Sequence, residues 1–420
     1  MVRETTEIAV IGAGVVGLTI ALELIDRGHE VVLVDPGQPG MGASYGNAGT
    51  IAGYATSPVG TPDVLRSLPS LLLSKTSPLA IRHRALPSLA PWLLRFLWQS
   101  LPAQAERNAR GIALLLNGAA EMWDDLALRV QGAGILQRRG CLYLYETPQA
   151  FTQAWTELDR RRALGVEVDL LGPDRLTDME PNLAPGLGGA AFFTGATFLD
   201  DPGRMMGLLA AAVQQKARYI RARAERLERR PDGVVIEGGS KDGGKDGGLH
   251  LHARRVVIAA GAHSRRLAAQ AGDRIPLDTE RGYHVEWDMA KPLLSRPACP
   301  TARGFYFCPM AGRLRVAGTV ELGGLTLPPS PHRIAKLVEG ARAFFPDLGP
   351  PDREWMGFRP SLPDSLPVIG PSVGGDEVIL AFGHGHLGVT MAPVTARIVS
   401  DLIAGRDPGR VAVACRATRF

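Results

Sequence analysis

Cysteines and long apolar runs are scarce in this chain of 420 residues. The four cysteines, Cys141, Cys299, Cys308 and Cys415, are scattered and lack the Cys-x-x-Cys spacing of redox and zinc motifs. Reduced, buried thiols are the default for such a set, so we expect a reducing compartment and no disulfide framework. No window is apolar for long enough to cross a bilayer.

A strong excess of one charge is also absent. Lys plus Arg number 47 and Asp plus Glu 42, which leaves a net charge of +5. No basic run alternates with aromatic residues, so nucleic acid is not an expected partner. His250 and His252 alternate on one strand face, so they could bind a metal or simply face solvent at a strand edge. The solvent-facing edge is favoured, and we expect no metal. The N-terminal residues lack the sections of a signal peptide, and we therefore expect the cytosol.

The most informative feature that is present lies near the N-terminus, in the run EIAVIGAGVVGLTIALELIDRGHEVVLVD. Gly12, Gly14 and Gly17 stand between an apolar strand and an apolar-periodic helix, and Asp35 ends the next strand. This spacing is typical of a dinucleotide-binding turn, in which backbone amides and the helix N-terminus meet the phosphates. An acid at position 35 accepts ribose hydroxyls and disfavours a 2′-phosphate, so NADP is not expected. The alternative is a similar turn without a ligand.

The character of the sequence changes several times along the chain. Strands and helices alternate over 1–58, 186–265 and 355–420, which predicts one cofactor domain of the Rossmann type assembled from three segments. The intervening segments, 59–185 and 266–354, contain aromatic-rich alternating runs such as GCLYLYET and RGYHVEWDM. Alternation of this kind predicts antiparallel strands. We therefore expect an α/β protein with a discontinuous cofactor domain and an α+β substrate domain built on an antiparallel sheet.

One segment of the second domain is unusually rich in leucine and tryptophan. Residues 64–101 combine Trp92 and Trp98 with isolated arginines and several prolines. Such a segment can lie in a membrane interface, with its apolar faces buried and its arginines towards anionic lipid. The alternative is a set of helices packed on the body of the enzyme. A separate run rich in glycine, lysine and aspartate, EGGSKDGGKDGG, predicts a solvated hairpin tip.

A second glycine-rich turn lies near the C-terminus. The strand EVILAF is followed by GHGHLGVT, which leads directly into a helix. At a helix N-terminus preceded by glycines, backbone N–H groups and the helix dipole stabilise negative charge. A reduced flavin develops such charge along its pyrimidine edge. A nicotinamide ring needs no such partner. The pairing of this turn with the N-terminal one therefore favours FAD over NAD.

Several motifs together carry a resemblance that spans nearly the whole chain: GASYGNAGTIAGYA, VVIAAGAHS, RGYHVEW, GFRPSLPDSLPVIG and GHGHLGVTMA. With the N-terminal turn, they resemble the flavin-dependent amine oxidoreductases of the D-amino-acid oxidase and glycine oxidase type. Among these, the chain is most similar to the bacterial D-amino-acid dehydrogenases of the small-subunit type. The resemblance implies FAD, an antiparallel substrate domain and oxidation of a Cα–N bond to an imine.

The resemblance also implies roles for individual residues. Arg359 matches the arginine that pairs with the substrate carboxylate, the alternative being a surface ion pair. Tyr283 matches a tyrosine that meets the same carboxylate or covers the ring, the alternative being a packed strand aromatic. Tyr54 and His386 are expected in the pocket wall. The residues expected to bind the cofactor are Gly12, Ala13, Gly14, Val15, Val16, Gly17, Asp35, Pro36, Ala43, Ser44, Asn47, Ala48, Gly49, Ala224, Ala260, Gly261, Gly357, Gly385, His386, Leu387, Gly388, Val389 and Thr390.

Three functions remain open on these grounds. The first is a dehydrogenase for a D-amino acid or cyclic amine that passes electrons to a quinone or another carrier, with a membrane surface as a partner. The second is an oxygen-using oxidase of the glycine or sarcosine type. The third is a flavin-bearing subunit of a larger assembly. Cys308 lies outside the motif context of the cysteine-linked sarcosine oxidases, so non-covalent FAD is expected. Hydride transfer depends mainly on orientation, and no general base is assigned from sequence.

Overall fold

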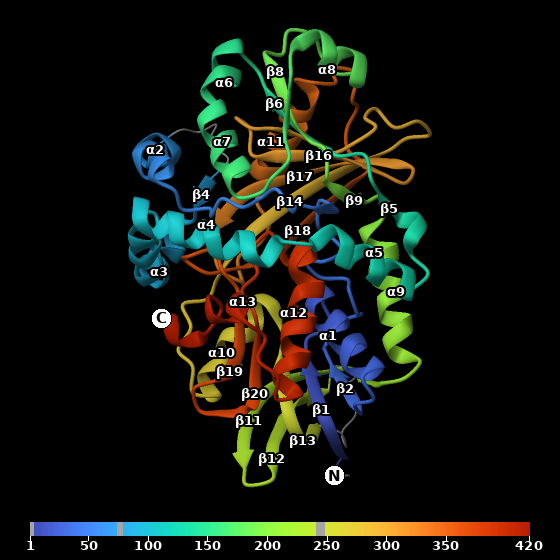
Figure 1. The fold of residues 1–420 in the computed structure, drawn as a ribbon, viewed down its shortest axis with the longest axis vertical. Helices are drawn as coiled ribbons and strands as arrows, with labels where there is room; N and C mark the ends of the chain where they lie inside the picture. Colours follow the sequence, from blue (N-terminus) through green and yellow to red (C-terminus); the bar gives the residue numbers. More distant parts are fainter. Residues whose placement is uncertain (1–3, 74–78, 241–247) are drawn as a thin grey trace.

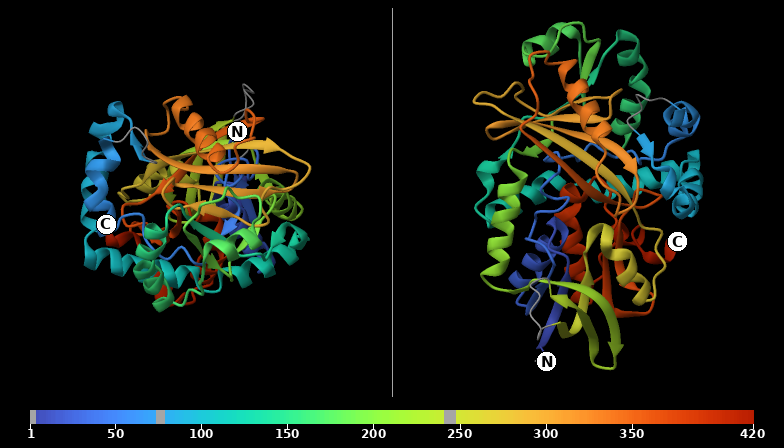
Figure 2. Two further views of the ribbon diagram at one scale, coloured as in Figure 1. Left: turned by 90° about the horizontal axis from the view of Figure 1, so that it is seen from above. Right: turned by 180° about the vertical axis from the view of Figure 1, so that it is seen from behind.

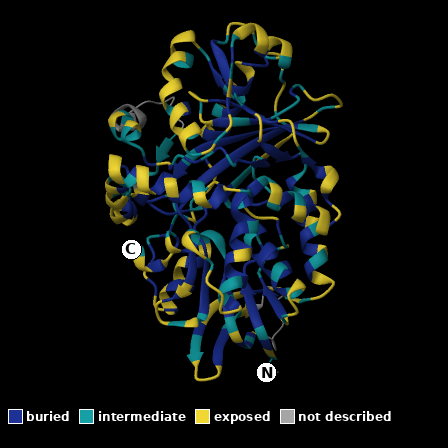
Figure 3. Cartoon of the chain, viewed as in Figure 1, coloured by how far each residue is buried: buried dark blue, intermediate teal, exposed yellow. Residues whose placement is uncertain are grey.

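The computed structural model describes residues 4–73, 79–240 and 248–420. Two large sheets lie end to end along the long axis of the molecule (Figure 1). The N-terminal strand and the C-terminal helices belong to the lower part in that view, and the aromatic-rich strands form the upper part. Figure 3 shows that both sheets are buried along most of their length, while exposed residues concentrate on the helices around them.

The lower sheet is the predicted dinucleotide-binding sheet. Its central strands are parallel, and the apolar residues where they pair, 8–11, 31–34, 256–258 and 378–380, are buried, as in parallel sheets covered on both faces. The parallel strands are β1 (Glu4–Ile11), β2 (Val31–Val34), β10 (Arg218–Ile220), β13 (Leu249–Ile258) and β20 (Gly375–Phe382). Antiparallel partners are β11 (Ala222–Arg230), β12 (Gly233–Ser240) and β19 (Val368–Ser372).

Helices from distant parts of the chain cover this sheet. The helices that share one core with its strands are α1 (Val15–Asp26), α4 (Pro102–Leu116), α5 (Ala119–Arg129), α9 (Pro202–Gln214) and α12 (Gly388–Ile403). Helix α10 (Ser264–Gln270) packs in a second core with β11 to β13. The first core brings the N-terminal turn and the start of α12 close together, because α1 and α12 lie side by side in it.

The upper sheet is antiparallel apart from two parallel pairs. In spatial order its strands are β18 (Arg353–Ser361), β14 (Asp278–Asp288), β17 (Arg313–Leu322), β16 (Phe305–Met310), β15 (Ala298–Pro300), β6 (Cys141–Tyr145), β8 (Gly189–Phe193) and β7 (Asp169–Leu171), with β4 (Leu79–Ile81) beside β17. The surrounding helices are α6 (Pro148–Gln153), α7 (Trp155–Ala163), α8 (Pro173–Met179) and α11 (Pro331–Arg342). Figure 2 shows α11 lying across the outer side of the sheet.

Short elements join the two parts. A small sheet of β3 (Thr50–Ile51), β9 (Thr197–Leu199) and β5 (Leu136–Gln137) lies between them. Two helices, α2 (Pro62–Leu73) and α3 (Leu86–Gln99), form one edge of the molecule, and α13 (Arg410–Val413) lies near the C-terminus. The leucine- and tryptophan-rich segment is thus helical at both ends, with 74–78 outside the described residues.

The mixed α/β architecture is confirmed, and the sheets divide the chain at points slightly different from the expected ones. Strand β8 lies within 186–265, and β18 lies within 355–420 except for its first two residues, yet both belong to the upper sheet. The run GFRP therefore forms part of a strand and not a turn. Pro360 is compatible with that strand because β18 lies at the edge of the sheet. On an edge strand the missing N–H of proline need not remove a hydrogen bond to a neighbouring strand.

The hairpin expected around the glycine-rich run forms from β12 and β13, which pair antiparallel. Its tip, 241–247, lies outside the described residues. His250 and His252 lie on the β13 side and face Glu237 and Asp232 individually. Among the described residues, no group of three or more His, Cys, Asp or Glu side chains could hold a metal ion.

Helix α12 begins at Gly388 and contains Pro393, which has no amide hydrogen for the carbonyl of Val389 one turn earlier. The indole N–H of Trp123 on α5 donates to that carbonyl instead, at 2.8 Å. Trp123 is completely buried. The side chain therefore replaces a missing helical hydrogen bond and fixes the start of α12 to α5.

We expect Trp123→Phe to destabilise the protein by about 1–3 kcal/mol, because the ring area is largely kept while a buried carbonyl loses its donor. Urea unfolding of the FAD-loaded protein measures this. Trp155→Phe is the matched control, since Trp155 is half exposed and should change stability by less than about 0.5 kcal/mol. Equal stability of the Trp123 variant and the wild type would show that the carbonyl needs no donor.

Candidate cofactor and substrate site

A cavity of about 1410 Å³ opens between the two sheets. Its lining includes the carboxyl ends of β1, β2 and β13 and residues of β14, β17 and β18. The carboxyl ends of parallel strands are where α/β sheets bind ligands. One continuous cavity therefore joins the dinucleotide turn to the antiparallel sheet.

The N-terminal turn forms one end of this cavity. Gly12 has φ +109°, and a Cβ there would lie 2.4 Å from the carbonyl oxygen of Ala259. A Cβ at Gly17 would lie 1.8 Å from the carbonyl oxygen of Gly12, so only glycine lets α1 pack this closely. The two oxygens of Asp35 accept the amides of Ala13 and Gly37, at 2.8 and 2.7 Å. Each oxygen retains a free lone pair for a ribose hydroxyl.

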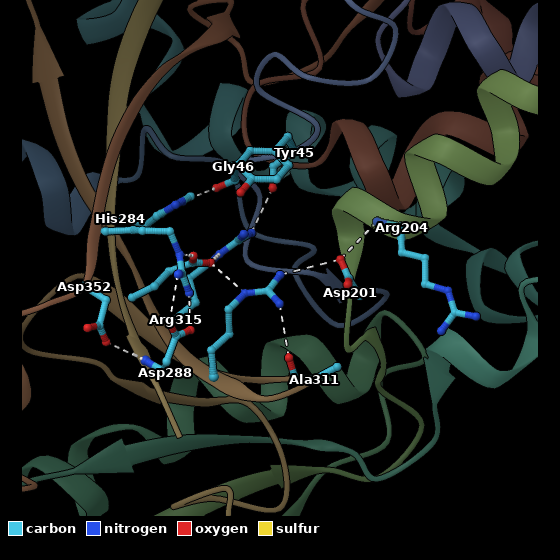
Figure 4. A network of polar contacts seen from close by, with 12 residues as sticks. Tyr45, Gly46, Asp201, Arg204, His284, Asp288, Ala311, Arg315 and Asp352 are labelled. Atoms are coloured by element: carbon cyan, nitrogen blue, oxygen red, sulfur yellow. Dashed lines mark hydrogen bonds and ion pairs between the residues drawn. The ribbon is translucent and has the colours of Figure 1, made fainter. Parts of the chain in front are cut away.

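The loop after β2 reaches along the cavity. Ser44 Oγ accepts the amide of Val15 at the start of α1, at 2.9 Å. Asn47 and Ala48 line the cavity. The carbonyls of Tyr45 and Asn47 accept from one guanidinium nitrogen of Arg315, at 2.9 and 2.6 Å (Figure 4). The loop is thus held from behind by the upper sheet.

His284 completes this attachment. Its Nδ1 lies 3.2 Å from the carbonyl oxygen of Gly46, which requires the ring to donate from Nδ1. Burial and the charge of Arg315 lower the pKa of His284 to about 3, so the ring is neutral at physiological pH. Three consecutive carbonyls, from residues 45 to 47, therefore point towards Arg315 and His284.

Glu286 anchors the arginine. It is buried and accepts from Arg315 and Arg313, at 2.8 and 3.1 Å, and from Arg353 at 2.8 Å. Burial alone would raise the pKa of Glu286, but the charge of Arg315 and hydrogen bonds from Arg353 and Arg315 hold it at about 2. The carboxylate is therefore ionised at any physiological pH and holds the Arg315 guanidinium in position.

The far end of the cavity is formed by the turn before α12. Residues Gly385 to Val389 line it, and the first-turn amides of α12 lack helical partners. His386 faces the cavity, and burial together with the charge of Arg359 lowers its pKa to about 4. His384 also lines the cavity, and its Nε2 lies 3.0 Å from the hydroxyl of Thr395 on α12. The turn therefore offers neutral donors and a helix N-terminus to a ligand.

Arg359 on β18 lies in the cavity wall as predicted. One guanidinium nitrogen donates to the carbonyl of Thr319 at 2.8 Å. The guanidinium lies over Gly282, where a Cβ would approach it within 2.4 Å. No ion pair joins Arg359 to any carboxylate among the described residues, so the alternative of a surface ion pair does not hold. Its charge is available to an anion in the cavity.

Tyr283 is among the residues that line the cavity, but its hydroxyl is already engaged by other groups of the protein. Its hydroxyl donates to Glu321 at 2.9 Å and accepts the amide of Ser330 at 3.1 Å. The cross-strand pairing puts Tyr283 one residue out of phase with Glu280 and Gly282, which share a face with Arg359. Its ring packs in the core beneath α11. These contacts favour the packed strand aromatic over a contact with the substrate carboxylate, which stays a prediction.

Tyr54 also lies behind the pocket wall. Its hydroxyl donates to the thiol of Cys141 at 3.1 Å, and its ring stacks on Phe193 with centroids 4.2 Å apart. Two other tyrosines, Tyr143 and Tyr306, line the cavity in front of it, and their hydroxyls are 2.9 Å apart. These two had no distinguishing signal in the sequence, because both stand in ordinary alternating strands.

Most of the expected cofactor residues line the cavity. Three do not: Gly17 packs against the N-terminal turn, Gly49 against the carbonyl of Leu199, and Thr390 accepts the amide of Ala52. The cavity-lining residues are Gly12, Ala13, Gly14, Val15, Val16, Asp35, Pro36, Ala43, Ser44, Asn47, Ala48, Ala224, Ala260, Gly261, Gly357, Gly385, His386, Leu387, Gly388 and Val389. Trp355, whose indole lies against Gly46 and Gly357, was not expected there.

The FAD dependent oxidoreductase family (DAO) matches residues 7–402 of this chain. The chain belongs to that family. A D-amino-acid oxidase of Bradyrhizobium diazoefficiens is 33% identical over 99% of both chains, and a D-amino acid dehydrogenase 2 of Ralstonia nicotianae is 32% identical over 96% of this chain and 97% of its own. Among solved structures, glycine oxidase from Geobacillus kaustophilus has a TM-score of 0.78 at 24% identity and complete coverage of both chains. These relationships confirm the resemblance and FAD as the cofactor.

The described residues of this flavoprotein fit FAD along the whole cavity. Asp35 and the N-terminal turn match the ribose and pyrophosphate, and the amides at the start of α12 match an electron-rich ring. The cysteines nearest the cavity are buried. Burial raises the pKa of Cys141 to about 12 and those of Cys299 and Cys308 further, so none of these thiols is a ready nucleophile.

Proposed function

We propose that this flavoprotein oxidises the α C–N bond of a D-amino acid or a related cyclic amine to an imine, which water hydrolyses to a 2-oxo acid. The observation that carries the proposal is Arg359, a half-buried arginine in the cavity wall that forms no ion pair with any described carboxylate. The names of the relatives from Bradyrhizobium and Ralstonia, which cover nearly their whole length, support the same substrate class.

Arg359 binds the substrate carboxylate in a bidentate pair, and the planar fork of the guanidinium fixes its orientation. FAD, when bound, would supply the acceptor for the hydride of Cα. Thr319 holds the guanidinium at the position it needs, and Gly282 leaves room for it. Tyr143, Tyr306 and His386 supply further wall around the substrate space. Correct placement of Cα–H supplies much of the rate in such a site.

The electrons of the reduced flavin must pass to an acceptor. We infer a membrane quinone, which places the enzyme on the cytoplasmic face of a membrane. Helix α3 carries Leu86, Leu94 and Trp98 at spacings of four or eight residues, and all three are exposed, Leu94 by 68%. The sequence between Asp63 and Glu106 contains no acidic residue and several arginines, which suits an anionic lipid surface. Among the described helices, none has the length and apolarity needed to span a membrane.

The substrate proposal is tested with a panel of D- and L-amino acids and an artificial dye acceptor under anaerobic conditions. Flavin bleaching by one or more D-amino acids, with formation of the 2-oxo acid, is the expected result. Preference for an L-amino acid would reject the stated chirality. Failure of the whole panel to reduce the flavin would reject the substrate class.

We expect fast reaction with quinone or dye acceptors, slow reaction with oxygen, and binding to vesicles of anionic lipid. Flotation with and without high salt, combined with a peroxide assay during turnover, measures all three. A Leu94→Ser/Trp98→Ser double variant should lose vesicle binding and keep its activity with a soluble dye. Leu128→Ser, an equally exposed leucine on α5, is the matched control. Stoichiometric peroxide without flotation would identify an oxygen-using oxidase instead.

We expect FAD to copurify and to be released by acid or heat, because the cavity-side cysteines have raised pKa values and stand outside the motif of the cysteine-linked enzymes. Absorbance of the supernatant after acid precipitation measures the released flavin. Yellow colour that stays with the denatured pellet would show a covalent link. The Cys308→Ala variant then decides whether Cys308 forms it.

A further inference from the structure

Glu280 on β14 is the exception among the buried carboxylates. The described residues include six that are less than a tenth exposed. Four of them, Glu180, Glu286, Glu321 and Asp364, form ion pairs with arginine. Asp273 accepts from the hydroxyl of Ser372 and the amide of Val373.

Glu280 forms no ion pair with any described cation, although it is only 6% exposed and lines the cavity. A buried carboxylate without a cation costs several kcal/mol of free energy, so it needs a compensating partner. The cavity is the side from which such a partner can reach it.

Arg359 lies directly opposite Glu280 in the pairing of β14 with β18. Directly opposed residues have Cβ atoms roughly 4.5–5.5 Å apart and point to the same face. The guanidinium nevertheless turns away, over Gly282 and towards the carbonyl of Thr319. One wall of the cavity therefore presents a cation and an anion on neighbouring strands that do not form an ion pair with each other. The cavity lies in front of both groups.

A zwitterionic amino acid has the complementary arrangement, with a carboxylate and an ammonium group on one carbon. We propose that Glu280 binds the ammonium group of the substrate and accepts one of its protons, while Arg359 binds the carboxylate. This rests on the function proposed above. An N–H bond breaks, the proton passes to the Glu280 carboxylate, and the nitrogen keeps the electron pair. That pair forms the C=N bond as Cα–H leaves with its two electrons to the bound flavin.

The surroundings of Glu280 suit a proton acceptor. Burial raises the pKa of Glu280, and the charge of Arg359 and a hydrogen bond with Ser361, both on β18, offset part of the rise. His386, from the turn before α12, is neutral because its pKa is about 4. Asp278 lies two residues earlier on the same face, and Glu321 on β17 is turned to the other face and paired with Arg281. Arg359 is thus the charged group that acts on Glu280 most directly.

The test compares Glu280→Gln with the wild type in anaerobic flavin reduction by the best D-amino acid, across neutral to alkaline pH. General base catalysis of this kind contributes on the order of 100-fold or more, so we expect a deficit of about 100-fold at neutral pH. The deficit should shrink by about tenfold per pH unit, because the free-amine fraction of the substrate rises by that factor below its pKa. Asp278→Asn, a carboxylate two residues away, is the matched control and should keep the wild-type profile.

Binding gives a second readout that does not depend on turnover. The amino acid 2-methylalanine has both charged groups but no Cα–H, and D-lactate has the carboxylate without the amine. Perturbation of the flavin absorbance measures both affinities. We expect Glu280→Gln to weaken binding of 2-methylalanine and to leave D-lactate binding unchanged.

Several results would overturn the proposal. A deficit that is the same at every pH, or a parallel loss of D-lactate binding, would mean that Glu280 only supports Arg359. Wild-type rates in the variant would remove Glu280 from the reaction. If the wild type itself reduces its flavin with no D-amino acid, the proposed function fails instead. If Glu280→Gln does not retain FAD, Glu280→Ala takes its place, and a deficit that stays the same at every pH would contradict the proposal.

Discussion

Replacing Arg359 by alanine is expected to lower kcat/KM for the D-amino acid by roughly 30- to 5,000-fold while FAD remains bound. Removing one partner of a desolvated arginine–carboxylate pair costs on the order of 2–5 kcal/mol. Arg359 makes no contact that the dinucleotide end of the cavity depends on, since its polar partner is Thr319. Steady-state kinetics with a dye acceptor and the flavin content of the purified variant measure both parts.

Two further variants sharpen this expectation. Arg359→Lys should restore little activity, because an ammonium group cannot form the planar fork. Gly282→Ala should mimic part of the loss, since its methyl group would displace the guanidinium. Arg342→Ala, on α11 and bonded to the carbonyl of Leu348, is the control and should behave as the wild type. Near-normal kinetics in the alanine variant would exclude Arg359 from the substrate site.

Replacing Glu286 by alanine is expected to destabilise the protein by about 3–5 kcal/mol, because Arg315 would remain buried without its carboxylate. Loss of Arg315 from its position would also release the carbonyls of Tyr45 and Asn47, so FAD should bind more weakly. Urea unfolding and flavin fluorescence titration measure these effects. Glu354→Ala, an exposed carboxylate on β18, should change stability by less than about 0.5 kcal/mol.

The pH dependence of this contribution has a definite sign. The pKa of Glu286 is about 2 in the folded protein against an ordinary value of 4.5. A lowered pKa stabilises the folded state fully above pH 4.5, and the stabilisation disappears as pH falls from 4.5 towards 2. The wild type should therefore lose about 3 kcal/mol more than Glu286→Gln over this window. Parallel loss in both proteins would mean that other carboxylates govern acid unfolding.

The dinucleotide end of the site could be predicted because its determinants are local. The turn, the helix and Asp35 lie within one short stretch, and the requirement for glycine at positions 12 and 17 is steric. For Tyr283, a local signal favoured the packed strand aromatic, which was the alternative to a carboxylate contact. Tyr283, Val285 and Trp287 form one apolar face of β14 and lie in the core beneath α11. Their alternation with Gly282, His284 and Glu286 predicts that the tyrosine faces away from Arg359.

Other features had no local signal. The attachment of the 45–47 carbonyls by Arg315 joins residues about 270 positions apart, and nothing near either end of the contact predicts it. The register of β14 with β18 likewise places Glu280 opposite Arg359. Local sequence gives the chemistry of these side chains, whereas the pairing of distant strands decides which of them meet.

The order of strands in the lower sheet has a consequence for how the protein is made. Strand β1 has no neighbour in the chain except β2 until β13 is synthesised, and β13 in turn needs β20. Helix α12, which shares the core with α1, follows later still. The ribosome must therefore release almost the whole polypeptide before this half can close, and one edge of β1 stays unpaired until β13 is made. Such long-range pairing folds slowly and leaves a strand edge open to pairing with other chains.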